Sequence, residues 1–202
     1  MQKIYETIGE AWVDALKDVY NSKDFVEDYK EVLNFQTSFL HNVQSDFIIA
    51  QDARVQADTL EMRKVFFTAE ENIFGHSYYN TGKGPFGNNG VEDIITLLKE
   101  NTTSKRAALS YPPYAHGKVP CINLIHFMIR ENQLVVHYYS RGQDMYRKFP
   151  CDAICIAEMA QEVATALDIP IHSITATISS AHIYEYDFEK TVTYLEQQAV
   201  GV

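Results

Sequence analysis

The chain has few cysteines, glycines and prolines, and it has no long apolar run. Three cysteines in 202 residues are too few, and odd in number, for a disulfide framework. The nine glycines and six prolines form no linker or low-complexity tract, so residues 1–202 are expected to fold as a single domain. The longest apolar runs, residues 47–50 and 134–136, fall far short of the roughly 20 residues that span a bilayer. No membrane span is therefore expected.

Positive charge is also scarce. The chain has 17 lysines and arginines against 27 aspartates and glutamates, a formal net charge of −10. This balance disfavours non-specific nucleic-acid binding, which needs clustered cations, whereas a small anion needs only a few. The N-terminus lacks the basic and apolar stretches of a secretion signal, so we expect the protein in the cytoplasm. Cys151 and Cys155 are spaced for one helix face, but without well-spaced histidines they predict no metal site.

Apolar spacing predicts the secondary structure of the first half. A helix ending near Asn21 is expected from apolar residues at helical intervals: Ile4, Ile8, Trp12, Ala15 and Val19. Residues 32–39 and 47–50 predict strands joined by the polar turn 41–46. Thr68 and Glu71 have the spacing of a capping box, in which a hydroxyl and a carboxylate bond free amides, so a helix is expected to begin there.

Glycine content and the spacing of apolar residues predict the secondary structure of the second half. Four glycines in residues 82–90 predict a loop, and residues 91–98 predict a helix on the core surface. A long helix is expected over 156–167, ending near Asp168 and Pro170. Strands are expected at 107–111, 122–129, 134–140, 174–178 and 183–188, with 122–129 and 134–140 paired as a hairpin through the turn 130–133. The predicted fold class is mixed α+β.

Cys121 is the candidate nucleophile. It follows Pro120 at the entry to a predicted strand, and Arg141 lies 20 positions downstream. A cysteine reacts as its thiolate, and a nearby arginine lowers the thiol pKa by stabilising that charge. A lone cysteine is more often a small buried apolar residue, so the motifs around it must decide between the two interpretations.

Those motifs resemble the thymidylate synthase family at fixed spacing. The family's Pro-Cys, Arg-Ser-x-Asp, Pro-x-Asn and Asp-Ala-His-Ile-Tyr motifs correspond in order to Pro120-Cys121, Arg141-Gly-Gln-Asp144, Pro150-Cys-Asp152 and Ala181-His182-Ile-Tyr184. Ser104-Lys-Arg-Ala107 is similar to its Ser-Arg-Arg segment, and Gly84-Pro-Phe-Gly87 to its Gly-Pro-x-Tyr-Gly loop. The resemblance covers roughly residues 66–188 and implies a mixed sheet flanked by helices, with a homodimer formed through the sheet.

The resemblance implies roles for the cationic residues and the nucleophile. Cys121 would add to carbon 6 of a pyrimidine nucleoside monophosphate, and carbon 5 would then attack the methylene group of 5,10-methylenetetrahydrofolate. Arg141 would bind the 5′-phosphate while lying near the thiolate. Lys105 and Arg106 would reach the phosphate bound by the partner subunit, so the homodimer would be required for activity.

The other matched positions have roles at the sugar, the folate and the reacting carbon. His182 and Tyr184, two apart on a strand, would bind the 3′-hydroxyl, and Asp144 would contact the folate. Gly142 replaces the family's serine and so removes one phosphate donor. Glu70 is our candidate general base, chosen over Glu71 because the capping box would engage Glu71 with the backbone. Helix capping alone would also explain both acids.

Asp152 replaces the asparagine that binds the uracil edge in thymidylate synthases. Cytosine offers an amino donor at N4 and an acceptor at N3, so a carboxylate accepts from N4 and can share a proton with N3. An ionised carboxylate opposite uracil O4 would set acceptor against acceptor, at a cost of roughly 1–3 kcal/mol. The same replacement characterises cytidylate hydroxymethylases. The sequence is therefore similar to a folate-dependent C5 hydroxymethyltransferase acting on dCMP or CMP.

Two departures and two alternatives stay open. Trp12 lies outside the matched region, so the family's folate-site tryptophan has no counterpart, and the family's C-terminal segment is expected to be absent or reduced to residues 197–202. One alternative is a thymidylate synthase that methylates dUMP with Asp152 protonated. The other is a non-catalytic nucleotide-binding homologue.

Overall fold

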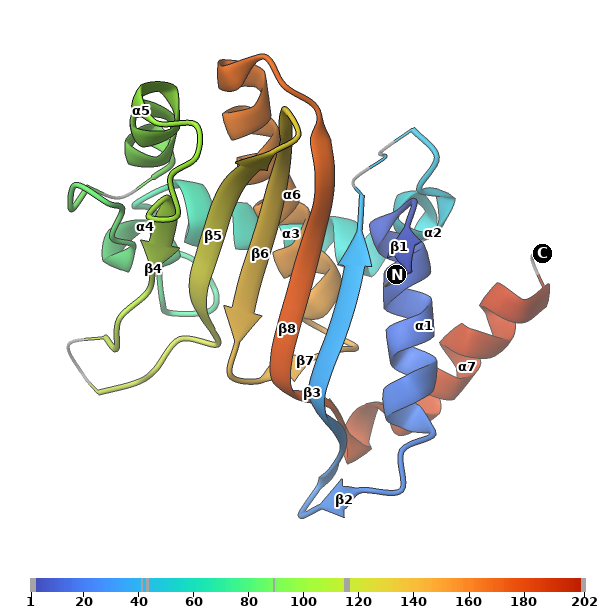
Figure 1. Cartoon of the computed structure of the whole chain (residues 1–202). Helices are drawn as coiled ribbons and strands as arrows, with labels where there is room; N and C mark the ends of the chain where they lie inside the picture. Colours follow the sequence, from blue (N-terminus) through green and yellow to red (C-terminus); the bar gives the residue numbers. More distant parts are fainter. Residues whose placement is uncertain (1–2, 41, 43, 89, 115–116, 201–202) are drawn as a thin grey trace.

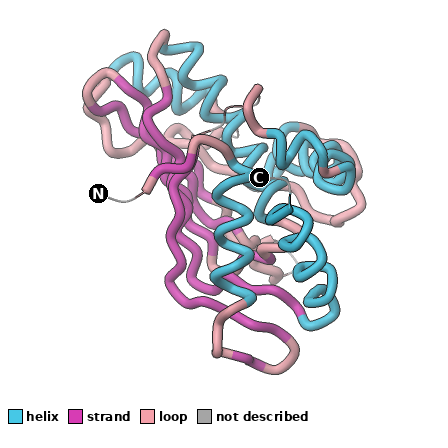
Figure 2. The backbone as a smooth tube through the Cα atoms, turned by 90° about the vertical axis from the view of Figure 1, so that its right-hand side faces the viewer, coloured by secondary structure: helices cyan, strands magenta, loops and turns pink. Residues whose placement is uncertain are grey.

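The protein is built on one mixed β-sheet with most helices packed against one face (Figure 1). The computed structural model describes residues 3–40, 42, 44–88, 90–114 and 117–200. Strands follow the spatial order β1-β3-β8-β6-β5-β4, with β2 paired to β3 and β7 to β8. Viewed from the side, the strands form one layer and the helices gather beside it (Figure 2). The predicted α+β class is confirmed.

The described elements have the following bounds. The strands are β1 Ile4–Tyr5, β2 Phe25–Val26, β3 Tyr29–Phe39, β4 Ala108–Ser110, β5 Ile122–Arg130, β6 Gln133–Ser140, β7 Gln143–Asp144 and β8 Ile171–Tyr184. The helices are α1 Ile8–Tyr20, α2 Phe47–Gln51, α3 Ala53–Phe67, α4 Tyr78–Thr81, α5 Glu92–Glu100, α6 Phe149–Leu167, the short 3₁₀ helix η1 Glu185–Asp187 and α7 Phe188–Val200.

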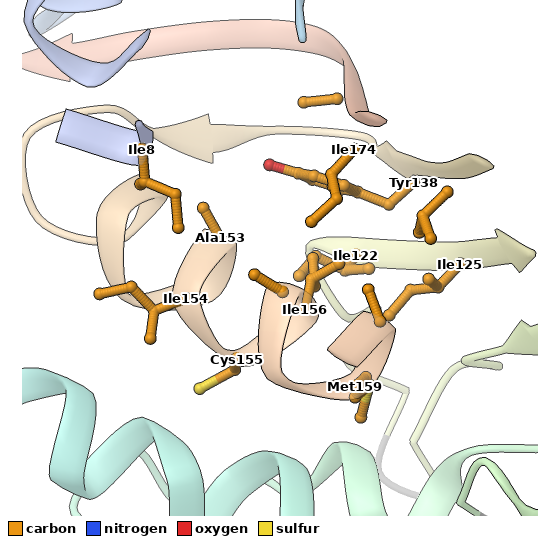
Figure 3. Packing of buried hydrophobic residues seen from close by; sticks show 14 of the residues in the cluster. Ile8, Ile122, Ile125, Tyr138, Ala153, Ile154, Cys155, Ile156, Met159 and Ile174 are labelled. Carbon is orange, nitrogen blue, oxygen red and sulfur yellow. The ribbon is translucent and has the colours of Figure 1, made fainter. Parts of the chain in front are cut away.

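Helix α6 forms the centre of the core. Most of its residues are buried, because it lies between the sheet and α3. Ile156 of this helix lies next to Ile122 of β5 (Figure 3). Burying a side chain of this size stabilises the fold by about 1.5–3 kcal/mol. The tight packing fixes where α6 begins, and the start of α6 carries candidate site residues.

Several sequence-based predictions are confirmed. Helix α1 begins after Thr7, whose side chain accepts a hydrogen bond from the Glu10 amide at 3.1 Å. β5 and β6 pair as the expected hairpin. Its turn residues, Glu131 and Asn132, both have left-handed backbone angles (φ 51° and 57°), as tight hairpin turns require. Helix α6 ends at Asp168 as predicted, although it begins seven residues before Ile156.

The predicted strand at residues 47–50 is wrong, because this segment is helix α2. The buried Asp46 accepts hydrogen bonds from the amides of Ile49 (3.1 Å) and Gly9 (2.9 Å). These bonds cap α2 and tie it to α1. A short apolar run does not by itself separate a strand from a helix turn. The predicted turn 41–46 includes residues 41 and 43, which lie outside the described residues.

The helix start predicted at Thr68 is also wrong. Thr68 is extended (φ −135°, ψ 162°) and ends helix α3, with its hydroxyl donating to the Lys64 carbonyl at 3.2 Å. The same oxygen accepts from the Glu70 amide at 3.2 Å. The pattern of a capping box here marks a helix end followed by a turn. The reason for preferring Glu70 over Glu71 therefore falls away.

The two strands predicted at 174–178 and 183–188 are one continuous strand, β8, which ends at Tyr184. Ser179 and Ser180 look like a break in the sequence, but backbone pairing with β3 continues past them, with Ser180 opposite Leu33. Residues 185–188, predicted as strand, instead form η1 and the start of α7.

The sheet face opposite the core carries both polar side chains and exposed apolar ones such as Leu33 and Leu124. Along β6 and β8, residues that face the core alternate with residues that face away from it. On this open face His137 and Gln36 both hydrogen-bond the Thr177 hydroxyl (2.8 and 3.1 Å), and Tyr139 bonds Ser179 (2.8 Å). Within the described part of the chain, no helix combines the length and apolar character needed to cross a membrane.

Candidate active site

Cys121 lies immediately before β5 and is fixed through its backbone. Its carbonyl accepts hydrogen bonds from the Arg141 amide (2.9 Å) and from the Ser140 hydroxyl (3.0 Å). Ser140 is the last residue of β6 and pairs with Ile122. The two strands of the hairpin are paired along their length, so the end of β6 lies beside the start of β5. This pairing places Arg141 beside Cys121, 20 residues earlier in the sequence.

The Arg141 side chain holds the same segment. Its Nε donates to the Pro120 carbonyl at 3.1 Å, and its Nη2 donates to the Val119 carbonyl at 2.9 Å. A guanidinium carries five N–H donors, so three are left for a ligand. Arg141 is exposed, and its positive charge lowers the pKa of the Cys121 thiol.

The net pKa of Cys121 nevertheless lies above its ordinary value. Burial among surrounding protein atoms is the largest cause, and the negative charge of Asp152 adds to it. Arg141 and Lys148 oppose this shift. The residue is nevertheless exposed at the surface of the chain. At neutral pH most molecules carry the protonated thiol, which must lose its proton before it can attack.

Removing the Arg141 charge (Arg141→Gln) is expected to raise the thiol pKa further and to weaken nucleotide binding about tenfold to a hundredfold. The first effect is measured as a shift to higher pH in the rate of alkylation of Cys121. The second is measured by titration with a pyrimidine nucleoside monophosphate. Arg130→Gln, at the exposed far end of β5, is the matched control. Equal behaviour of the two variants would contradict the role given to Arg141.

Asp152 lies in the first turn of α6 and is only 4% exposed. Burial raises the pKa of its carboxyl to about 6, against the lowering effects of a hydrogen bond from Gln143 and of the Lys148 charge. The Gln143 Nε2 donates to Asp152 Oδ2 at 2.7 Å. Asp152 Oδ1 is buried and has no hydrogen-bond partner among the described residues. A buried acceptor without a partner is costly, so this oxygen is a candidate acceptor for a ligand donor.

His182 and Tyr184 lie next to each other on β8, with ring centroids 5.1 Å apart. The Nδ1 of His182 lies 3.1 Å from the Ser180 carbonyl. Because a carbonyl only accepts, Nδ1 carries a proton in this contact. Tyr184 interacts electrostatically with Cys121 and Asp144, so the pair belongs to the same site. A Cβ at Gly142 would lie 3.7 Å from the His182 ring, an ordinary contact.

Asp144 of β7 is an electrostatic neighbour of both Cys121 and His182. Its Oδ1 accepts hydrogen bonds from the amides of Tyr146 (3.1 Å) and Arg147 (2.9 Å). Burial is the main cause of its raised pKa, and the His182 charge opposes the shift. Arg147 is held in turn by Asp187 of η1 through hydrogen bonds from Nε and Nη2. This pair ties the end of β8 to the segment before α6.

Three residues near Cys121 were not predicted as site residues from the sequence. Lys148 caps the start of α6 and is a positive neighbour of both Cys121 and Asp152. Tyr78 accepts a hydrogen bond from the Ile122 amide at 3.2 Å. Tyr114 interacts with Cys121, and burial raises its pKa to about 12. The position of Lys148 just before the Pro-x-Asp motif was an available signal, whereas the two tyrosines come from segments with no distinctive pattern.

Lys105 and Arg106 lie elsewhere in the chain. Both are exposed between α5 and β4, and the Lys105 carbonyl lies 3.0 Å from the His126 Nε2. His126 is five residues along β5 from Cys121, roughly 17 Å at the rise of a strand. Lys105 therefore lies beside the open face of the sheet, well away from Cys121 of its own chain.

Glu70 and the C-terminal helix are also placed by the structure. Glu70 is exposed and lines a surface pocket with Glu71, His76 and Tyr114. Helix α7 packs on α1, with Tyr194 against Trp12 at 4.8 Å between ring centroids. Residues 197–199 line a different cavity, together with Lys3, Tyr5 and Arg54. Residues 201–202 lie outside the described residues.

The fold and the site define a mixed α+β protein in which an exposed cysteine has a guanidinium, a buried carboxyl and a histidine–tyrosine pair as neighbours. The family model "Thymidylate synthase" matches residues 58–201. The chain belongs to the thymidylate synthase family. Members of this family transfer one-carbon units to pyrimidine nucleotides.

Similar proteins agree with this assignment. A protein of Methanothermobacter thermautotrophicus named "Putative thymidylate synthase" is 32% identical over 129 residues, which cover 62% of this chain and 58% of that protein. One of the same name from Methanosarcina mazei is 26% identical over 196 residues, 91% of this chain and 89% of that protein. The thymidylate synthase of Mycoplasma genitalium is 26% identical over 182 residues, 88% of this chain and 58% of that protein. The alignment thus spans less than two thirds of the first relative.

Proposed function

We propose that this protein is a folate-dependent transferase that attaches a hydroxymethyl group to carbon 5 of a cytidine monophosphate. Cys121 adds to carbon 6 of the base, which makes carbon 5 nucleophilic. Arg141 binds the 5′-phosphate, and His182 and Tyr184 bind the sugar hydroxyl. 5,10-Methylenetetrahydrofolate supplies the one-carbon unit when bound.

Asp152 carries the proposal for cytosine. Its Oδ2 is occupied by Gln143, so Oδ1 is the one oxygen that remains for the base. Above a pKa of about 6 this oxygen is an acceptor, which matches the N4 amino group of cytosine and opposes O4 of uracil. The start of α6 adds the positive end of a helix dipole, which favours the charged form.

A group that accepts the carbon 5 proton completes the chemistry. We propose Glu70 for this role, with Glu71 as the alternative. Both line a pocket together with Tyr114, and Tyr114 interacts electrostatically with Cys121. The proton moves from carbon 5 to the carboxylate when the one-carbon unit has been attached. Tetrahydrofolate would then leave, water would add to the exocyclic methylene group to give the hydroxymethyl group, and Cys121 would be released from carbon 6.

The residues present fit the folate. Asp144 Oδ1 is taken by two backbone amides, and no described residue donates to Oδ2. A carboxylate oxygen in this state suits the N–H donors of a pterin ring. Tyr186, which stacks on Tyr184 at 5.2 Å, offers an aromatic face nearby.

The active form is proposed to be a homodimer joined through the open sheet face. Lys105 lies beside His126 of that face, so a second copy packed there would bring Lys105 and Arg106 toward the partner's phosphate site. The face is continuous across four strands, β3, β8, β6 and β5.

Release of tritium from carbon 5 tests the substrate. With methylenetetrahydrofolate present, labelled dCMP is expected to release tritium faster than labelled dUMP, since only cytosine offers a donor to Asp152 Oδ1. Faster release from dUMP would overturn the cytidylate proposal in favour of thymidylate synthesis. Nucleotide binding without release from either base would support a non-catalytic homologue.

Mass analysis of the product distinguishes the transferred group. Addition of a hydroxymethyl group raises the nucleotide mass by about 30 units, and addition of a methyl group raises it by about 14. A gain of about 30 is expected. Running dCMP and CMP in parallel also identifies the sugar.

A further inference from the structure

Gln143 is a buried amide in the middle of the site, and the proposed chemistry has not yet used it. It is 1% exposed and belongs to β7, whose backbone pairs with β8 at Ala181. Its neighbours in sequence are Gly142 and Asp144. The backbone pairing fixes Gln143 between the residues proposed for the phosphate and for the folate, where its side chain extends toward α6 and Asp152.

The hydrogen bond between Gln143 and Asp152 has one allowed direction when the carboxyl is ionised. The Gln143 Nε2 donates to Oδ2 at 2.7 Å, because a carboxylate offers acceptors only. Gln143 Oε1 and Asp152 Oδ1 are then both buried without a hydrogen-bond partner among the described residues. A buried acceptor without a partner is costly, and an exocyclic amino group would supply a donor to such an oxygen.

We propose that Gln143 is a positioning residue that makes Asp152 specific for an amino-bearing base, by occupying Oδ2 and keeping Oδ1 an unprotonated acceptor for the base. This inference rests on the proposed function, because it explains how that site selects cytosine. A proton on Oδ2 would collide with the Gln143 donor, so protonation of Asp152 falls on Oδ1. Oδ1 would then donate, and it would match uracil O4 instead.

The base preference is therefore tied to the charge of Asp152. The groups that interact with Asp152 come from every element packed around it: Tyr78 of α4, Cys121 before β5, Tyr138 of β6, Asp144 of β7, and Lys148, Cys151 and Cys155 at or within the start of α6. Of these, Lys148 favours the charged carboxyl and Asp144 disfavours it, while the Gln143 bond favours it. Removing the Gln143 donor raises the pKa of Asp152 above its value of about 6.

The sign of the pH effect follows from this shift. In the parent protein Asp152 is ionised above about pH 6, so the preference for dCMP over dUMP holds at neutral pH and is lost as pH falls through that value. In Gln143→Met, which keeps the length but removes the amide, the midpoint is expected about one to two pH units higher. At pH 7 the dCMP preference is then expected to fall about tenfold.

The experiment is a competition titration of dCMP against dUMP on the full chain between pH 5 and 9. Gln143→Asn retains an amide one methylene shorter and is expected to recover part of the parent midpoint. Gln161→Met, an exposed amide on α6, is the matched control and should titrate like the parent. In Asp152→Asn, adding Gln143→Met should no longer move any midpoint, because the titrating group is gone.

The outcomes separate the two proposals. A parent protein that prefers dUMP at every pH refutes the cytidylate substrate. The role of Gln143 is then tested by comparing the pH midpoint of dUMP binding between the parent and Gln143→Met. An unchanged midpoint and an unchanged base preference in a folded Gln143→Met protein refute the role of Gln143. If that variant does not fold, the same comparison is made with Gln143→Asn, whose midpoint must exceed that of the parent.

Discussion

Cys121→Ser is expected to lower turnover by at least about a thousandfold while leaving the dissociation constant for the nucleotide within about threefold of the parent value. The serine hydroxyl has the shape of the thiol but does not ionise near neutral pH, so it cannot add to carbon 6. Binding persists because Arg141 is anchored by the carbonyls of Val119 and Pro120, and by its own amide, none of which involves the sulfur. Steady-state tritium release and equilibrium titration measure the two effects.

The control for this variant is another cysteine of the chain. Cys155 is fully buried in α6, and burial raises its pKa well above the ordinary value, so it is unreactive. Cys155→Ala is expected to keep turnover close to that of the parent, with some loss of stability from the smaller side chain. Turnover by Cys121→Ser at more than a tenth of the parent rate would show that the sulfur is not the nucleophile.

Asp152→Asn is expected to reverse the base preference. An asparagine oxygen can still accept from Gln143 Nε2, which turns its amino group toward the base. That donor matches uracil O4 and opposes the N4 amino group of cytosine. Losing one match and gaining one clash, at ~1–3 kcal/mol each, is expected to change the ratio of kcat/KM for dCMP over dUMP by about a hundredfold or more.

The reversal is measured with both labelled nucleotides in one competition assay. Asp168→Asn is the matched control, since Asp168 ends the same helix with a left-handed φ of 53°, a position that asparagine tolerates. The parent preference for dCMP is also expected to decline as pH falls through about 6, the pKa of Asp152. A parent and an Asp152→Asn protein with the same base preference would remove Asp152 from the recognition of the base.

The spacing of apolar residues correctly predicted the elements that have one apolar face and one polar face. Helix α1, helix α5 and the β5–β6 hairpin follow the expected pattern. Helix α3 was missed because its buried positions, such as Val55 and Met62, are separated by charged and polar residues. Helix α3 packs against α6, and this packing stabilises a helix that the spacing of its apolar residues does not predict.

Local motifs were less informative where two structures share one pattern. Thr68 was interpreted as a helix start although it ends α3, and both interpretations place a hydroxyl near free backbone groups. The residue pair Ser179 and Ser180 resembled a break, yet the long β3 strand opposite holds β8 straight through it. In both cases the local structure depends on a neighbouring element. A sequence pattern of a few residues does not reveal a neighbour that is distant in sequence.

The candidate site could be predicted as far as motif spacing reaches. The hairpin and the turn into α6 bring together Cys121, Arg141, Asp144 and Asp152, each of which was named in the sequence. The partner of Asp152 could not be predicted, because Gln143 meets it through the orientation of one side chain. The net rise in the Cys121 pKa also needed the structure, because burial outweighs the nearby cations.

The central claim is that the Cys121 sulfur bonds to carbon 6 of the base. A nucleotide with fluorine at carbon 5 cannot lose a proton there, so the adduct should accumulate when methylenetetrahydrofolate is present. Peptide mass analysis after incubation with 5-fluoro-dCMP, and in parallel with 5-fluoro-dUMP, is the direct measurement. One nucleotide is expected to be attached to the peptide that contains Cys121. Turnover of the unfluorinated nucleotide with Cys121 never modified, or a nucleotide attached to another residue, would contradict this claim.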